Sequence, residues 1–280
     1  MKTVDYRNIV NVVAGLCRQA NIYLPEDISE AIAKAQKKEG SPRALSVFKT
    51  IKDNQKIAAE KNWPLCQDTG TAVVFLRMGT EVKVEGGFIY DAINEGVAQG
   101  YSEHYLRKSI VAHPWLRTNT GDNTPAVIHT ELVPGDELKI TLMPKGGGAE
   151  NVSRLLMMKP ADGVDGIKAA VLDCVRSAGG SSCPPLVIGI GVGGNFETVP
   201  LLAKRALLRP LGQYHSEPSV REQENSLFSA VNQLGIGAMG YGGDITCLWL
   251  AMEVAPCHIA SMPLAINLCC HVARHKSCEF

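Results

Sequence analysis

The chain changes character within one stretch, Cys66-Gln67-Asp68-Thr69-Gly70-Thr71-Ala72-Val73-Val74-Phe75-Leu76. Before it, residues 1 to about 60 carry apolar residues at helical spacing, and Leu24-Pro25-Glu26-Asp27 is a turn that suits the start of a helix. From Thr71 to Leu76 the chain is a short apolar run of strand character. The sequence therefore predicts a helical N-terminal portion that is followed by strands.

The rest of the chain alternates between the two kinds of element. Leu138–Leu142 and Leu186–Val192 have strand character, whereas Tyr90–Gly100 and Val199–Leu208 have helical spacing. We predict a mixed α/β fold, in which the helical segment precedes a mixed sheet with helices and glycine-rich loops. One domain over residues 1–280 is the default, with two lobes as the open alternative.

Composition excludes some classes of partner. Lys plus Arg and Asp plus Glu both number 28, so the formal net charge is zero, which argues against nucleic acid or an anionic membrane as the main partner. The N-terminal residues lack the pattern of a secretory signal, and no run is apolar enough to span a bilayer. Nine cysteines, an odd number, indicate a reducing compartment, so we expect a cytoplasmic protein.

Three cysteines lie in settings that can present a thiolate to a shared point: Cys66, Cys183 in Ser181-Ser182-Cys183-Pro184-Pro185, and Cys270 in Asn267-Leu268-Cys269-Cys270-His271. A free cysteine is more often a small buried hydrophobe. The apolar surroundings of three others fit that role: Cys17, Cys174 and Cys247. The chain has no CxxC pair, so a zinc ribbon or a thioredoxin-type site is not indicated. Three thiolates without a fourth suggest a metal centre with an open coordination position.

The motif Cys66-Gln67-Asp68-Thr69-Gly70 combines a thiol, an amide, a carboxylate and a turn glycine. A bare Asp-Thr-Gly could belong to an aspartic protease, but that chemistry needs two such motifs and the chain has one. The alternative is a simple turn. The adjacent Cys66 and Gln67 favour a site.

Three further segments can bind anions: one around Arg107, one from Arg117 to Pro125 and one from Lys145 to Asn151. Arg107 and Arg117 each offer a guanidinium fork, although such arginines are more often surface residues. The segment Asn119–Pro125 is dense in amides and hydroxyls, which a polar loop also explains. Lys145-Gly146-Gly147-Gly148-Ala149-Glu150-Asn151 can turn backbone N–H groups towards an anion or be a flexible loop, but it lacks the spacing of a P-loop.

Two other features are weaker evidence for a functional site. Gly189, Gly191 and Gly194 match the spacing of a dinucleotide-binding fingerprint, but we expect Pro200 to interrupt the helix that should begin there, so this interpretation is rejected. A lone histidine such as His258 on an apolar stretch is usually a core residue, and its link to a site depends on Cys270 being a ligand.

Taken together, five motifs resemble the class I fumarate hydratase family over nearly the whole chain: Cys66–Gly70, Asn119–Pro125, Lys145–Gly148, Ser182–Pro185 and Ala265–Cys270. More narrowly, the chain looks like the α subunit of the two-subunit form, which is related to L(+)-tartrate dehydratase α. The motifs occur in the right order, which makes the resemblance specific.

The resemblance implies an oxygen-sensitive [4Fe–4S] cluster held by Cys66, Cys183 and Cys270. The family's Cys-x-x-x-Arg run fits Cys270 to Arg274, so Cys270 rather than Cys269 is the expected ligand. The fourth iron then carries no protein ligand and binds substrate. By the same resemblance, the substrate-site positions are Gln67, Asp68, Arg107, Gly148 and His258, with catalytic roles expected for Asp68, Arg107 and His258.

The resemblance also implies that the catalytic base and several carboxylate-binding residues belong to a separate β subunit, in an α2β2 assembly. The expected reaction is the reversible dehydration of (S)-malate to fumarate, with the labile iron as the Lewis acid for a small dicarboxylate. L(+)-tartrate is the alternative substrate. A non-catalytic iron–sulfur or scaffold protein is the hypothesis from a different class.

Overall fold

A computed structural model describes all residues, 1–280, and they form two compact units. The first unit comprises residues 1–25, 54–147 and 274–280, and the second comprises residues 26–53 and 148–273. Helices and mixed sheets occur in both units, which confirms the predicted mixed α/β fold.

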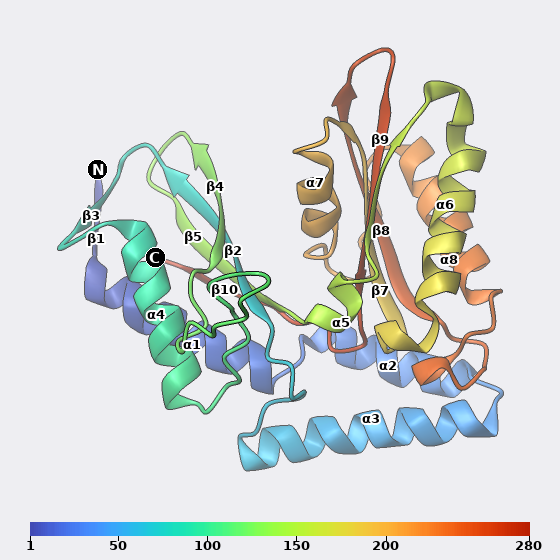
Figure 1. Ribbon diagram of the computed structural model, residues 1–280, viewed down its shortest axis with the longest axis horizontal. Coiled ribbons are helices and arrows are strands. Elements are labelled where there is room, and N and C mark those ends of the chain that lie inside the picture. The colour runs from blue at the N-terminus through green and yellow to red at the C-terminus, as the bar shows by residue number, and fades with distance from the viewer. The chain divides into compact units, whose positions relative to one another are not determined.

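The first unit packs two long helices against a sheet (Figure 1). Its elements are β1 (Lys2–Asp5), α1 (Tyr6–Ile22), β2 (Thr71–Gly79), β3 (Val82–Glu85), α4 (Ile89–Glu103), β4 (Val127–Val133), β5 (Leu138–Lys145) and β10 (Lys276–Glu279). The sheet has the strand order β10-β5-β2-β4, with β2 parallel to β4 and antiparallel to β5, and β1 pairs separately with β3. The strand expected over Thr71–Leu76 and the helix expected over Tyr90–Gly100 are both present.

Helix α1 begins at a side-chain cap, because the Asp5 carboxylate accepts a hydrogen bond from the Asn8 backbone N–H at 3.1 Å. Its apolar residues recur at helical spacing and are buried, among them Ile9, Val13 and Cys17. They contact α4 and the inner face of the sheet. The core of the first unit therefore lies between the helix pair and the sheet.

The second unit is a sheet with helices on both faces. Its elements are α2 (Glu26–Lys38), β6 (Arg154–Met158), α6 (Gly163–Ala178), β7 (Leu186–Gly194), α7 (Val199–Ala206), α8 (Pro218–Asn232), β8 (Cys247–Cys257) and β9 (Met262–Cys269), with 3₁₀ turns at Pro160–Asp162, Gly179–Ser182 and Ala238–Gly240. Two helices cross the boundary between the units, α3 (Pro42–Lys61) and the one-turn α5 (Gly147–Glu150). The strand order is β6-β9-β7-β8, with α7 on one face and α6 and α8 on the other (Figure 1).

The glycines of β7 allow helix α7 to pack closely against this strand. A Cβ on Gly189 would lie 2.1 Å from the Ala203 carbonyl oxygen, and one on Gly191 would lie 2.4 Å from that of Val199. Helix α7 can therefore lie directly on the strand only because these positions carry no side chain. The expectation that Pro200 would interrupt this helix was wrong, because α7 begins at Val199 and proline is tolerated in the first helical turn, where no backbone N–H is needed.

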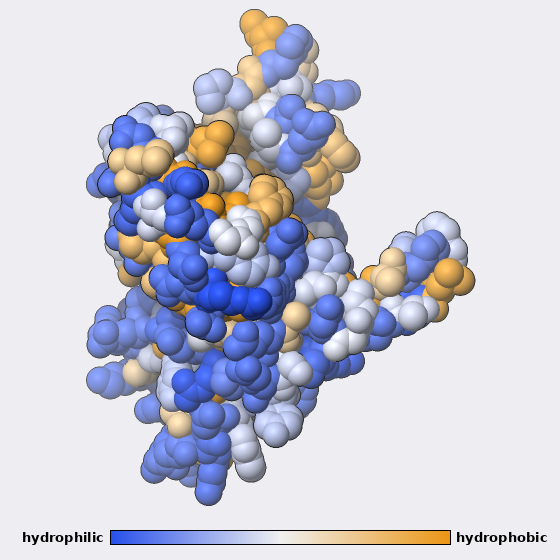
Figure 2. Space-filling view, turned by 90° about the vertical axis from the view of Figure 1, so that its left-hand side faces the viewer, coloured by the Kyte–Doolittle hydropathy of each residue, from blue (hydrophilic) through white to orange (hydrophobic).

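None of the helices combines the length and the apolar character that crossing a membrane requires. In the space-filling view, hydrophilic side chains cover most of the visible face, and hydrophobic ones gather in several separate groups among them (Figure 2).

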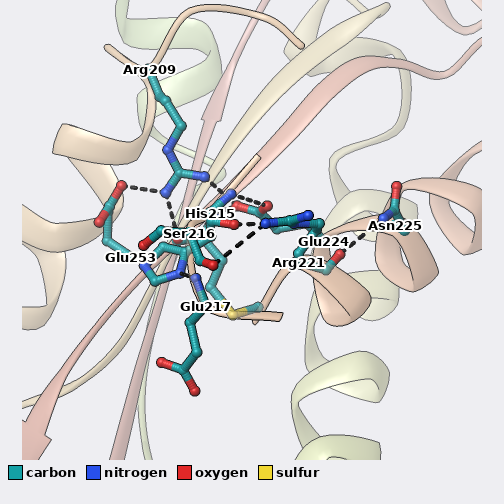
Figure 3. Close-up of polar contacts among 9 residues, drawn as sticks. Arg209, His215, Ser216, Glu217, Arg221, Glu224, Asn225 and Glu253 are labelled. Atoms are coloured by element: carbon teal, nitrogen blue, oxygen red, sulfur yellow. Dashed lines mark hydrogen bonds and ion pairs between the residues drawn. The ribbon is translucent and has the colours of Figure 1, made fainter. Parts of the chain in front are cut away.

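In the second unit, a buried ion pair joins Glu224 of α8 to Arg209 beside the middle of β8 (Figure 3). The Glu224 carboxylate is fully buried and accepts hydrogen bonds from the backbone N–H groups of Met252 at 2.8 Å and His215 at 2.9 Å. It also pairs with Arg209, whose guanidinium reaches Glu253 as well. Both carboxylate oxygens of Glu224 thus accept hydrogen bonds within the protein.

We predict that Glu224→Gln lowers the free energy of unfolding by about 3 kcal/mol or more, because Arg209 loses its buried counter-charge and an amide has one acceptor oxygen where the carboxylate has two. Chemical denaturation of the variant measures this change. Glu222→Gln, an exposed residue on the same helix, is the matched control and should stay within about 0.5 kcal/mol of the wild type. Equal effects of the two substitutions would contradict the role given to Glu224.

Candidate functional site

The Cys66–Gly70 segment is an ordered loop between α3 and β2 in the first unit. The Leu65 backbone N–H donates to the Asn21 carbonyl at 2.9 Å, and the Asn54 amide donates to the Leu65 carbonyl at 2.9 Å. Cys66 is half-buried, and its thiol lies 3.9 Å from the Gln67 side-chain oxygen. The loop therefore presents a thiol and an amide from a fixed backbone.

The Asp68 carboxylate is held by backbone N–H groups from two segments. Its Oδ1 accepts from Gly70 at 3.0 Å, and its Oδ2 accepts from Gly147 at 2.7 Å. The triple-glycine segment was expected to bind an anion or to be a flexible loop. In the structure it enters the one-turn α5, and its Gly147 N–H binds the chain's own carboxylate. Asp68 is thereby fixed in orientation.

Gly70 makes the close approach of these two segments possible. Its φ is +73°, and a Cβ at this position would lie 2.7 Å from the Lys145 backbone. A side chain would be strained by its backbone conformation and would push β5 away. The glycine of the Cys66–Gly70 motif is therefore required for the position of the Asp68 carboxylate.

Tyr101 and Asn123 stabilise the Cys66–Gly70 loop by hydrogen bonds to its backbone carbonyls. The buried Tyr101 hydroxyl lies 2.7 Å from the Thr69 carbonyl and 3.1 Å from the Gly70 carbonyl, and the Asn123 amide donates to the Gly70 carbonyl at 3.1 Å. Burial raises the pKa of Tyr101, so the hydroxyl keeps its proton and acts as a donor. The Thr69 hydroxyl donates to the Arg107 carbonyl at 3.0 Å, which attaches the arginine segment to the loop.

The Asn119–Pro125 segment uses its polar side chains mainly on the backbone. Asn119 bonds the Lys108 carbonyl and the Gly121 N–H, and Asn123 accepts from the Ser109 N–H at 2.7 Å. The Thr124 N–H and hydroxyl lower the pKa of Asp122. These residues shape the loop, whereas the Gln67 and Arg107 side chains remain exposed and available to a ligand.

In the second unit, the structure brings Cys183 and Cys270 to the same end of the sheet. The His271 backbone N–H donates to the Cys183 carbonyl at 3.3 Å, and the His271 ring Nδ1 lies 3.0 Å from the same oxygen. Cys183 has a φ of +52°, a region that non-glycine residues rarely adopt and that is common at functional sites. Cys270 is half-buried just beyond β9, whereas Cys269 is buried within it, which agrees with choosing Cys270 as the ligand.

His258 is not near Cys270 in this unit. It is exposed in the turn between β8 and β9, where its ring Nδ1 accepts from the Ala260 N–H at 3.1 Å. Cys270 follows the other end of β9, so the strand separates the two residues by roughly 25 Å at about 3.3 Å per residue. His258 is also not the core residue that a lone histidine on an apolar stretch usually is. Gly148, the remaining expected substrate position, begins the second unit next to the Ser181 carbonyl.

Cys17, Cys174 and Cys247 are buried, as the sequence predicts for them. No disulfide forms among the nine. Burial raises the pKa of the Cys17 and Cys247 thiols, and it raises that of Cys174 to about 11, so these three are poor thiolate donors. Cys66, Cys183 and Cys270 are all half-buried at loop positions. Neither unit by itself gathers three metal-binding side chains, and the proposed ligand set takes one cysteine from the first unit and two from the second.

Arg274, which served in the sequence only to select Cys270 as the expected ligand, contacts the Cys66 loop. Its Nη2 donates to the Asp68 carbonyl at 2.5 Å, while its Nε and Nη1 are buried and have no partner. An orphaned buried cation beside the Cys66 loop fits an anionic iron–sulfur group bound at Cys66. The Cys-x-x-x-Arg spacing was the available signal for Arg274. Tyr101 had no such signal in the sequence, because it is one of many apolar positions in a helix.

We predict that iodoacetamide at pH 8 alkylates the thiols of Cys66 and Cys183 in the native, metal-free protein well before those of Cys17 and Cys247. The thiolate is the nucleophile, and burial keeps the latter two protonated and covered. Mass spectrometry of peptides over time gives the order of modification. Early alkylation of Cys17 or Cys247 in folded protein would contradict this division of the cysteines.

Comparison with known proteins bears on the same residues. The family model described as fumarate hydratase (fumerase) matches residues 10–279. A Methanocaldococcus jannaschii protein, provisionally named L(+)-tartrate dehydratase subunit alpha, is 45% identical over 272 residues, covering 95% of each chain. The L(+)-tartrate dehydratase subunit alpha of Escherichia coli and that of Shigella sonnei are each 27% identical, covering 95% of this chain and 88% of theirs. The chain therefore belongs to the fumarate hydratase family, and it is a hydro-lyase.

Proposed function

We propose that this chain is the α subunit of a [4Fe–4S]-dependent hydro-lyase that interconverts (S)-malate and fumarate. The observation that carries the proposal is the convergence of the Cys66–Gly70, Asn119–Pro125 and Lys145–Gly147 motifs on one ordered loop in the first unit. Cys66, Cys183 and Cys270 would hold the cluster. When bound, its iron without a protein ligand supplies a Lewis acid for the substrate hydroxyl.

The chain's own residues would orient the dicarboxylate. The exposed Arg107 guanidinium can pair with one carboxylate through two parallel hydrogen bonds. Gln67 and Gly148 offer an amide and a backbone N–H, and Asp68 is held in a fixed direction by Gly70 and Gly147. A carboxylate bound at fixed points aligns the neighbouring C–H bond for removal of its proton.

A β subunit would supply the base that removes this proton. The relatives named above are called alpha subunits, which supports a partner subunit, and we propose an α2β2 assembly. The separation of His258 from Cys270 fits such an assembly, because His258 could then act at the site of a second copy. The nine cysteines without disulfides support a cytoplasmic location.

L(+)-tartrate is the second candidate substrate, and the tartrate dehydratase names of the relatives favour it. The two substrates differ by one hydroxyl, which a site distinguishes by hydrogen bonding. Anaerobically reconstituted protein, co-expressed with its partner, should show the higher kcat/KM for (S)-malate. A higher value for L(+)-tartrate would assign the chain to the second reaction.

If the chain is a non-catalytic iron–sulfur or scaffold protein, replacing Arg107 should not affect turnover. The proposed enzyme predicts the opposite. Arg107→Ala should lower kcat/KM by about 100-fold or more in the proposed enzyme, because a charged hydrogen-bonding pair is lost in the transition state. Arg77→Ala, an exposed arginine of the same unit, is the control. Unchanged turnover in Arg107→Ala would remove Arg107 from the substrate site.

The ligand set gives a prediction that does not depend on turnover. Cys66→Ser, Cys183→Ser and Cys270→Ser should each lose bound iron and sulfide, because a cluster held by two thiolates has too few anchors. Cys17→Ser should retain them. Cys269→Ser is the closest control, since it neighbours Cys270 but is buried in β9. Loss of iron from Cys269→Ser with retention in Cys270→Ser would show that Cys269, and not Cys270, is the ligand.

A further inference from the structure

Arg274 carries a charge that the protein itself does not neutralise. The residue is 4% exposed, and its only hydrogen bond goes from Nη2 to the Asp68 carbonyl. The Nε and Nη1 groups have no partner, and no carboxylate pairs with the guanidinium. Asp68, the adjacent acidic residue, turns both carboxylate oxygens to the backbone N–H groups of Gly70 and Gly147.

This arrangement is costly in the metal-free protein. A guanidinium has five N–H donors and stays protonated in proteins, so it cannot escape the cost of burial by losing its charge. A buried charge is tolerated when it is paired with an opposite charge and its donors are satisfied. The unused donors of Arg274 therefore require an anion.

The position of Arg274 indicates which anion. It binds the carbonyl of Asp68, two residues after Cys66, and in the sequence it follows Cys270 by four residues. Its unpartnered nitrogens are buried beside the loop that carries Cys66. A cluster with three thiolates is a resident anion, and hydrogen bonds to its sulfurs affect its retention and potential.

We propose that Arg274 is a positioning residue for the cluster: it fixes the Cys66 loop through the Asp68 carbonyl, and its Nε–H and Nη1–H groups would donate to the anionic group that Cys66 helps to hold. This inference rests on the proposed function, since it needs the cluster. Burial of the Arg274 guanidinium is then unfavourable in the protein without its cluster and favourable once the cluster is bound.

The test compares Arg274→Met and Arg274→Lys with the wild type in the complex with the partner subunit. In the complex stripped of its cluster, Arg274→Met should unfold at the same or a higher temperature than the wild type, because an unpaired buried charge has been removed. After reconstitution, the same variant should release iron to a chelator about 10- to 100-fold faster, as for other lost contacts around a metal site. Arg274→Lys, which keeps the charge, should release iron at a rate between those of the wild type and Arg274→Met.

Arg77→Met is the matched control, because Arg77 lies on β2 of the same unit with an exposed side chain. It should leave iron release unchanged. A lower unfolding temperature of stripped Arg274→Met would show an ordinary structural arginine and overturn the proposal. Unchanged iron release with weaker binding of succinate would also overturn it, by assigning Arg274 to a substrate carboxylate.

Failure of the proposed function has a different signature. If the reconstituted wild type holds no iron, both the cluster and this inference fall together. If the wild type holds iron and Arg274→Met releases it at the wild-type rate, the inference alone falls and the hydro-lyase proposal stands.

Discussion

The first unit depends on how the Asp68 carboxylate is bound. Its two oxygens accept backbone N–H groups from Gly70 and Gly147, which joins the Cys66 loop to the end of β5. The same residue's carbonyl accepts from Arg274, so the C-terminal segment is attached at the same point. One residue thus connects three segments that are distant in the sequence. The carboxylate of the Cys66–Gly70 motif is consequently structural as well as a candidate participant in the chemistry.

This role explains why so many polar residues surround a single loop. Backbone groups in an irregular loop have no sheet or helix partner, and each needs another acceptor or donor when it is buried. Tyr101 and Asn123 serve the carbonyls, and Gly147 serves the carboxylate. A rigid loop can then present a thiol at a fixed place, which a metal group requires of its ligands. In the second unit, the contact of His271 with Cys183 does the same for its two cysteines.

The sequence predicted the elements well because their signals are local. The spacing of Ile9, Val13 and Cys17 in α1 and the apolar run of β2 needed no knowledge of the rest of the chain. Its motifs indicated candidate site residues, but not the contacts between the motifs. Neither the bond between Asp68 and Gly147 nor the support from Tyr101 leaves a local pattern, since both join segments far apart. Pro200 was misjudged because its effect depends on its place within the helical turn. The exposure of His258 was not predicted, because a turn between strands resembles an apolar stretch in sequence.

The proposed ligand set is tested most directly by a structure of the reconstituted complex, determined without oxygen at the iron absorption edge. We expect one iron centre bound by Cys66, Cys183 and Cys270, with Asp68 still held by Gly70 and Gly147 and with Arg274 hydrogen-bonded to sulfur. An iron centre bound by a different set of cysteines, or no iron centre in a complex that still hydrates fumarate, would contradict it.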